Sequence, residues 1–105
     1  MKIGLYASMF GKDDPPTLQS IESYIEHAYD LRLDLIDFRS DRGFSSSEPD
    51  YLIKTKLTCI AKGLSIGYLA SGGHFIGTDE ELRAKVEQAK TDMDIALILG
   101  APMIR

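Results

Sequence analysis

Two patterns of hydrophobic and polar positions alternate along this chain. Short runs of consecutive apolar residues, each bounded by polar or glycine-containing segments, are typical of strands that are buried on both faces. Such runs lie at residues 2–8, 33–38, 64–70 and 102–105. Between them, apolar residues recur every three or four positions, which predicts helices over about residues 18–29, 50–62 and 79–99. The chain is therefore expected to alternate strand and helix along its whole length.

Capping signals and apolar spacing indicate where each predicted helix begins, ends and is buried. Thr17 is placed to cap the first helix, and Thr78 and Glu81 form a capping box at the start of the third. Gly63 and Gly100 follow the second and third helices, where a left-handed residue commonly ends a helix. The predicted apolar faces are Leu18, Ile21, Ile25, Ala28 and Tyr29 in the first helix, Ile53, Leu57 and Ile60 in the second, and Leu82, Val86, Ala89, Met93, Ala96 and Leu97 in the third.

The order βαβαβαβ predicts a parallel α/β sheet whose strands are joined by right-handed helical crossovers. Successive apolar positions in the strands, such as Leu35 and Ile36, indicate a sheet that is covered on both faces or rolled into a barrel. A doubly wound sheet would place helices on both faces, whereas a barrel segment would place all three on one face. Periodicity alone does not decide between the two. Because no helix follows the last strand, we expect a truncated or cleaved segment, or one completed by a second copy.

Composition and charge narrow the functional classes. The chain has 105 residues, which suits one domain, and its formal net charge is −4. Net negative charge argues against binding of a nucleic acid backbone as the main task. The single cysteine, Cys59, lies in an apolar helical pattern and is expected to be a buried, unreactive thiol. The sequence shows no signal peptide and no apolar stretch long enough to span a membrane, so we expect a cytoplasmic protein without a membrane partner.

Four segments, taken in order, resemble one family of proteins. They are KIGLYAS at residues 2–8, LRLDLIDFR at 31–39, GLSIGYLASGGHF at 63–75 and LGAPMIR at 99–105. Together they resemble the N-terminal half of the sugar phosphate isomerase/epimerase family, whose members are xylose isomerase-like TIM barrels. The resemblance implies that residues 1–105 form half of a (β/α)8 barrel, with chemistry at the carboxyl ends of the strands. It departs at Arg32, where the family usually has glycine, so either this residue accepts a positive φ at some cost or the turn is built differently.

The resemblance also implies a divalent metal, such as Mn, Mg, Zn or Co, in complete members of the family. Its ligands there are two Glu, one Asp and one His, which come from later strands of the barrel. No residue of this chain is therefore assigned as a metal ligand or as a catalytic group, and no cofactor is expected in the chain alone.

Five residues near the predicted strand ends are candidates for contacting a sugar or sugar phosphate. Tyr6 and Phe10 would wall a pocket, while Asp37 and Arg39 would hydrogen-bond hydroxyl groups or a phosphate. His74 follows two glycines, which let the backbone approach a ligand closely, and we favour substrate contact over metal binding there. Structural alternatives are an ion pair of Asp37 with Arg39 or with Arg105, and an exposed loop position for His74.

These expectations lead to one main function and two alternatives. The main one is the N-terminal part of a metal-dependent sugar or sugar-phosphate isomerase or epimerase, which supplies substrate-contacting loops and is inactive alone. The first alternative is a non-catalytic half-barrel that forms a homodimer through exposed strand edges or binds another chain. The second is an endonuclease-like lyase or nuclease, against which the net charge counts. Arg39 and Arg105 would suit a phosphate, with surface salt bridges as their alternative role.

Overall fold

The computed structural model describes residues 1–6, 20–72 and 75–105. Three parallel strands alternate with three helices: β1 (Gly4–Leu5), α1 (Ile21–Asp30), β2 (Leu35–Arg39), α2 (Pro49–Ala61), β3 (Ser65–Ala70) and α3 (Asp79–Leu99). The strand order β1-β2-β3 follows the chain, and both neighbouring pairs are parallel. Ile104 extends the sheet past β3 through a parallel bridge to Leu69. The predicted alternation is confirmed, with a shorter first strand and a fourth strand that is represented by this bridge.

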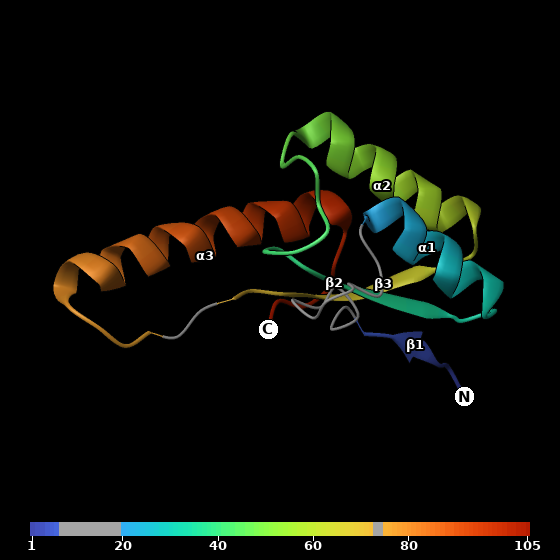
Figure 1. Ribbon diagram of the computed structural model, residues 1–105, viewed down its shortest axis with the longest axis horizontal. Coiled ribbons are helices and arrows are strands. Elements are labelled where there is room, and N and C mark those ends of the chain that lie inside the picture. The colour runs from blue at the N-terminus through green and yellow to red at the C-terminus, as the bar shows by residue number, and fades with distance from the viewer. Residues whose placement is uncertain (7–19, 73–74) are drawn as a thin grey trace.

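All three helices lie on the same side of the sheet (Figure 1). Helix α2 packs against both α1 and α3, so the helices form one continuous layer. Strands in chain order with every crossover on one face are typical of a barrel segment, because a doubly wound sheet needs helices on both faces. The helix positions therefore decide between a doubly wound sheet and a barrel segment, in favour of the barrel segment. The other face of the sheet is open along the described residues.

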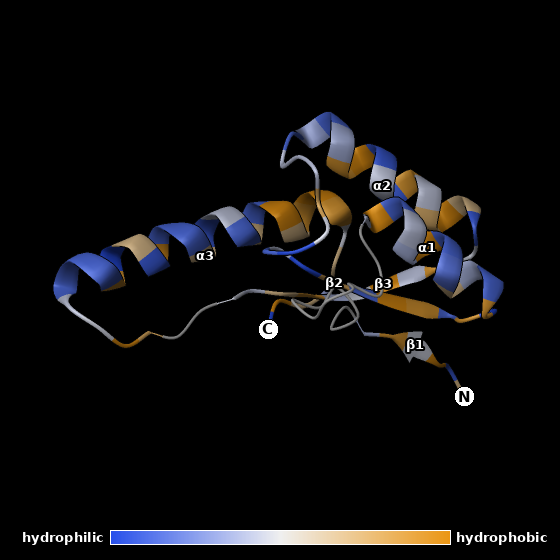
Figure 2. Cartoon of the chain, in the orientation of Figure 1, coloured by the Kyte–Doolittle hydropathy of each residue, from blue (hydrophilic) through white to orange (hydrophobic). Residues whose placement is uncertain are grey.

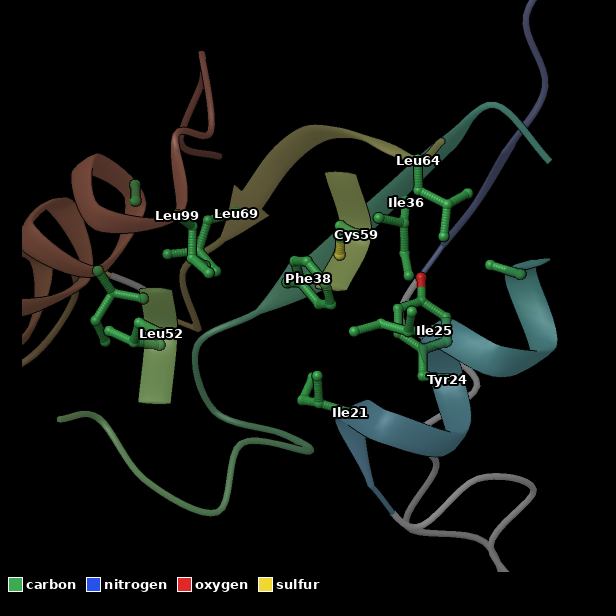
Figure 3. Packing of buried hydrophobic residues seen from close by; sticks show 13 residues of the cluster. Ile21, Tyr24, Ile25, Ile36, Phe38, Leu52, Cys59, Leu64, Leu69 and Leu99 are labelled. Carbon is green, nitrogen blue, oxygen red and sulfur yellow. The ribbon is translucent and has the colours of Figure 1, made fainter. Parts of the chain in front are cut away.

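The core lies between the helical layer and the sheet, and β2 contributes alternate residues to it. Ile36 and Phe38 are fully buried, whereas the residues on either side of them in β2 are only partly buried. Figure 3 shows Ile36 and Phe38 beside Tyr24 of α1 and Cys59 of α2. The rings of Tyr24 and Phe38 meet edge to face, with their centroids 5.8 Å apart. Cys59 is fully buried, as predicted.

One buried hydroxyl connects α1 to two strands. The Tyr24 hydroxyl oxygen lies 2.6 Å from the carbonyl oxygen of Leu5 and 2.8 Å from that of Asp37. Its single proton is shared between these acceptors, one at the end of β1 and one in the middle of β2. Burial raises the pKa of this phenol, and the nearby Asp37 carboxylate raises it further. Tyr24 therefore remains a neutral donor that fixes the position of Asp37 relative to β1.

The buried face of α2 differs from the predicted one. Ile53, Leu57 and Ile60 are 45–59% exposed. The residues that face the core are instead Leu52, Thr55 and Cys59. Both sets have helical spacing, so sequence periodicity fits either, and the packing of α2 on the sheet and its neighbours selects one. The unselected set forms an exposed apolar stripe, which we call the α2 stripe.

Helix α3 is buried only near its carboxyl end. Most of its first half is hydrophilic, and hydrophobic residues gather where it ends (Figure 2). Its buried residues are Asp92, Ile95, Ala96 and Leu99. Of the predicted face, Val86, Met93 and Leu97 are exposed, and Ala96 alone is buried. No helix in the described part of the chain has both the length and the apolar character needed to cross a membrane.

Caps and turns explain where the helices begin and end. Ser20 caps α1, because its hydroxyl accepts the backbone N–H of Ser23 at 3.1 Å. The prediction that Thr17 caps this helix is wrong, because the helix begins at Ile21 and its N-cap is Ser20. Thr17 itself lies outside the described residues. Thr78 caps α3 as predicted, since its hydroxyl accepts the Glu81 N–H at 3.3 Å.

The predicted left-handed residues are confirmed. Gly63 and Gly100 end α2 and α3 with φ of 71° and 74°. Arg32 has φ 55° and is the one non-glycine residue with positive φ in the described ranges. The turn between α1 and β2 therefore has the backbone geometry that suits glycine, and the Cβ of Arg32 crowds the backbone there.

Candidate functional site

The open face of the sheet gathers polar and aromatic side chains at the carboxyl ends of its strands. Tyr6 directly follows β1, and Asp37 and Arg39 alternate along β2 with residues that face the helices. Tyr68 belongs to β3, and Arg105 follows the bridge at Ile104. Parallel strands place their carboxyl ends at one edge, so these five residues form a candidate binding surface, here called the open-face cluster.

A β-bulge between β2 and β3 determines which residues of β3 lie opposite Asp37. Ile36 pairs with Ile66 and Phe38 pairs with Leu69, so Gly67 and Tyr68 together oppose Asp37. The Tyr68 backbone N–H donates to Asp37 Oδ1 at 3.2 Å. A Cβ atom on Gly67 would lie 2.3 Å from the same oxygen, a separation that no real contact allows. Glycine at residue 67 is therefore what lets the carboxylate rest against β3.

Among the residues that the structure describes, no cation forms an ion pair with Asp37. Burial raises the pKa of this carboxyl, and the hydrogen bond from the Tyr68 N–H opposes that rise without cancelling it. The alternative ion pair with Arg39 is wrong, because Arg39 forms its ion pair with Asp41. Asp37 is thus a carboxyl that holds a proton at higher pH than an ordinary aspartate.

Arg39 and Asp41 form a two-point ion pair at the end of β2. Arg39 Nε lies 2.9 Å from Asp41 Oδ1, and Nη2 lies 3.0 Å from Oδ2. The hydrogen bond from Arg39 lowers the pKa of Asp41 and raises that of Arg39, to which the Tyr6 hydroxyl adds a smaller contribution. Two of the five guanidinium N–H donors are used by Asp41, so the group is held in place with donors left for a ligand.

Two tyrosine rings lie side by side across the open face. The ring centroids of Tyr6 and Tyr68 are 6.2 Å apart, and the rings are inclined at 38°. The Arg105 guanidinium carbon lies 6.0 Å from the centroid of the Tyr68 ring. Burial raises the pKa of the Tyr68 hydroxyl, and Asp37 raises it further, while Arg105 opposes both. The two rings offer an apolar surface bordered by a carboxylate and guanidinium groups.

The structure brings three of the five predicted residues to this face. Tyr6, Asp37 and Arg39 lie on it, whereas Phe10 and His74 fall outside the described residues. Sequence analysis missed Tyr68, because the bulge changes the alternation of β3. The signal was the isolated glycine just before it, since glycine inside a strand pattern often marks a bulge.

The described residues do not fit the divalent metal that the resemblance implies. Among residues 1–6, 20–72 and 75–105, no three His, Cys, Asp or Glu side chains gather closely enough to hold an ion. Asp37 and Asp41 lie on the same face, but Asp41 is occupied by Arg39. No chemical step is therefore assigned to a metal on these residues.

Comparison with known proteins supports the fold. No protein-family model and no curated protein matches the sequence. A solved structure, the xylose isomerase domain protein from Planctomyces limnophilus, matches with a TM-score of 0.70 at 16% sequence identity. The chain has the fold of part of a xylose isomerase-like TIM barrel. The match covers 98% of this chain and 39% of that protein, so the chain spans well under half the length of the structure it matches.

The two faces of the sheet correspond to the outside and the inside of a xylose isomerase-like barrel. In such a barrel the helices form the outer ring, and the face without helices lines the interior. The open-face cluster therefore lies on the face that corresponds to the interior of such a barrel, near the mouth where the strands end.

Proposed function

We propose that this chain supplies one wall of the substrate site of a sugar or sugar-phosphate isomerase or epimerase. The observation that carries the proposal is the pair of rings of Tyr6 and Tyr68 beside the half-buried carboxyl of Asp37, on the interior face of a xylose isomerase-like fold. Sugars present an apolar C–H face and a rim of hydroxyl groups. Aromatic rings complement the first, and charged hydrogen-bonding groups complement the second.

Each side chain has a distinct part in the proposed site. Tyr6 and Tyr68 contact the C–H face of the sugar, and Asp37 accepts hydrogen bonds from its hydroxyl groups. Because the pKa of Asp37 is raised, its carboxyl also exchanges a proton more readily near neutral pH than an ordinary aspartate does. Arg39, fixed by Asp41, directs its remaining N–H donors toward substrate oxygens. These residues bind and orient, so we expect the chain alone to bind sugar weakly without turning it over.

Amide NMR titration with a sugar tests this proposal. D-fructose added to the isotope-labelled chain is expected to shift the amide signals of Tyr6, Asp37 and Tyr68. Tyr68→Ala should weaken binding about two- to tenfold, the range expected for one aromatic contact. Tyr29→Ala is the matched control, because Tyr29 is a half-exposed tyrosine on α1, in the helical layer. Equal effects of the two variants, or shifts confined to the helices, would remove the proposal.

The exposed sheet edge at residues 103–105 supports a second candidate, in which two copies of the chain pair. Leu69 N–H donates to the Met103 carbonyl, and Arg105 N–H donates to the Leu69 carbonyl. In a parallel strand the N–H and C=O of the residue between them point the other way, so those of Ile104 face outward. No strand lies beyond this edge within the described residues. We propose that a second copy adds its strands here.

Blocking the edge tests the pairing. Light scattering during size exclusion is expected to give the mass of a dimer for the unmodified chain. Ile104→Pro removes only the outward N–H and keeps both bonds to β3, so it should give a monomer. A monomeric unmodified chain at high concentration, or a dimer that Ile104→Pro leaves intact, would rule out pairing through this edge.

A further inference from the structure

A cavity lies near the amino ends of β2 and β3, beside the positive-φ residue Arg32. Its volume is about 480 Å³, and the described residues that line it include Tyr29, Asp30, Arg32, Leu33 and Lys62. They come from the end of α1, the turn after it and the C-cap of α2, which lie on the same side of the molecule in Figure 1. The volume falls within the roughly 300–1,000 Å³ of small-molecule sites, and the cavity lies at the opposite end of the sheet from the open-face cluster.

Arg32 keeps a backbone conformation that glycine would adopt at lower cost. Its φ is 55°, and it directly follows Leu31, the C-cap of α1, where glycine is the common residue. Its guanidinium forms no ion pair or hydrogen bond with a residue that the structure describes. Backbone strain of this kind clusters at ligand sites, where the side chain has a use that compensates for it. No contact within the described chain accounts for an arginine here, so its donors are free for an occupant of the cavity.

The cavity offers one uncommitted charge of each sign. Lys62 is engaged, because its ammonium lies 2.5 Å from Glu26 Oε1 and 4.5 Å from the centroid of the Tyr29 ring. Asp30 is exposed and forms no ion pair with a described residue. Helices α1 and α2 both end at this cavity, and the negative ends of their dipoles favour a positive group. A purely anionic ligand would be repelled by Asp30 and these helix ends, and a purely cationic one by Arg32.

A zwitterion satisfies both charges. The planar guanidinium of Arg32 matches a carboxylate, and the Asp30 carboxylate accepts hydrogen bonds from an ammonium. Tyr29, which is half-exposed, and Leu33, which packs against the core, give the cavity an apolar wall for a side chain. We propose that this cavity binds a free α-amino acid with an apolar side chain. Because the cavity lies away from the open-face cluster, this assignment does not depend on the proposed sugar-binding function.

Three probes of one shape test the two charges separately. L-leucine carries both charged groups, isocaproate lacks the ammonium, and L-leucinamide lacks the carboxylate. In amide NMR titrations at constant ionic strength, L-leucine is expected to shift the signals of Asp30, Arg32 and Lys62. It should bind at least about threefold more tightly than either analogue. Equal binding of isocaproate would show a simple anion site, equal binding of L-leucinamide a simple cation site, and either result, or no shift with L-leucine, would overturn the proposal.

Variants of Arg32 separate binding from folding. Arg32→Gly is expected to be more stable than the unmodified chain, yet it should bind L-leucine about three- to tenfold more weakly, as should Arg32→Gln. Arg83→Gln is the matched control, because it removes the same charge at an exposed residue of α3 outside the cavity. Asp30→Asn should weaken L-leucine and leave isocaproate unaffected or more tightly bound. Unchanged affinity for L-leucine in Arg32→Gln, or an equal loss in Arg83→Gln, would count decisively against the proposal.

Discussion

Replacement of Gly67 by alanine tests the packing that places Asp37 in the open-face cluster. The new Cβ would lie 2.3 Å from Asp37 Oδ1 and 3.5 Å from Cγ, so the carboxylate must turn away. Turning away breaks its hydrogen bond with the Tyr68 N–H. A hydrogen bond to a charged group contributes about 1.5–3 kcal/mol, and the partial exposure of Asp37 reduces this to about 1–2 kcal/mol.

A smaller effect acts in the opposite direction. Gly67 does not have positive φ, so alanine fits the backbone and restricts the unfolded chain, which stabilises the fold by about 0.4–1 kcal/mol. The lost hydrogen bond is the larger contribution. Gly67→Ala should therefore lower the free energy of unfolding by about 1 kcal/mol, which corresponds to roughly 4–8 °C in Tm for a domain of this size.

A double-mutant cycle with Asp37→Ala isolates the contact. Without the carboxylate, alanine at residue 67 meets no close atom from that side chain, so Gly67→Ala should be neutral or slightly stabilising in that background. Urea denaturation of the four proteins should give a coupling free energy of about 1–2 kcal/mol. A cost that is the same with and without Asp37 would refute this reasoning.

Three further predictions concern other parts of the chain. Arg32→Gly should raise the free energy of unfolding by about 0.5–1 kcal/mol, because removal of the Cβ at φ 55° relieves more strain than glycine costs in backbone entropy on folding. Arg32→Ala keeps the Cβ, so an equal increase in its denaturant midpoint would contradict this explanation. In a carbon NMR titration the midpoint of Asp37 should lie above 3.8 and that of Asp41 below it. The stabilisation from Asp41 is then present above its unfolded pKa and lost as pH falls through its lowered folded value, whereas ionisation of Asp37 weakens the fold as pH rises through its raised one. Arg39→Gln should move the Asp41 midpoint alone, and the reverse order of midpoints would show that the causes are misassigned. Burial raises the pKa of the Cys59 thiol to about 12, so DTNB should label it only after unfolding, and rapid labelling of the folded chain would disprove its burial.

The elements and their pairing could be predicted because they depend on local periodicity. Short apolar runs fixed three parallel strands, and the helical spacing between them fixed three helices. Tyr6, Asp37 and Arg39 were predicted as candidates because ligands of parallel sheets bind where strands end, and the structure places the three residues on one face. Even the strained turn at Arg32 was predictable, from the position where glycine was expected.

The errors came from features that depend on partners distant in sequence. In α2, Leu52 and Cys59 are spaced by seven residues, and so are Ile53 and Ile60, so the helix has two apolar sides and only its packing shows which is buried. The bulge at Gly67 exists only relative to β2, which is why Tyr68 was missed. Barrel or doubly wound topology likewise depends on where each helix packs, and the sequence pattern is the same for both.

The α2 stripe has a practical consequence for anyone who prepares this protein. Ile53, Leu57 and Ile60 are exposed on the helical layer, on the opposite side of the sheet from the open-face cluster. Exposed apolar side chains promote association at high concentration, and these three can be changed without altering the open-face cluster. Lysine or glutamate at these three sites should therefore improve yield and shelf life.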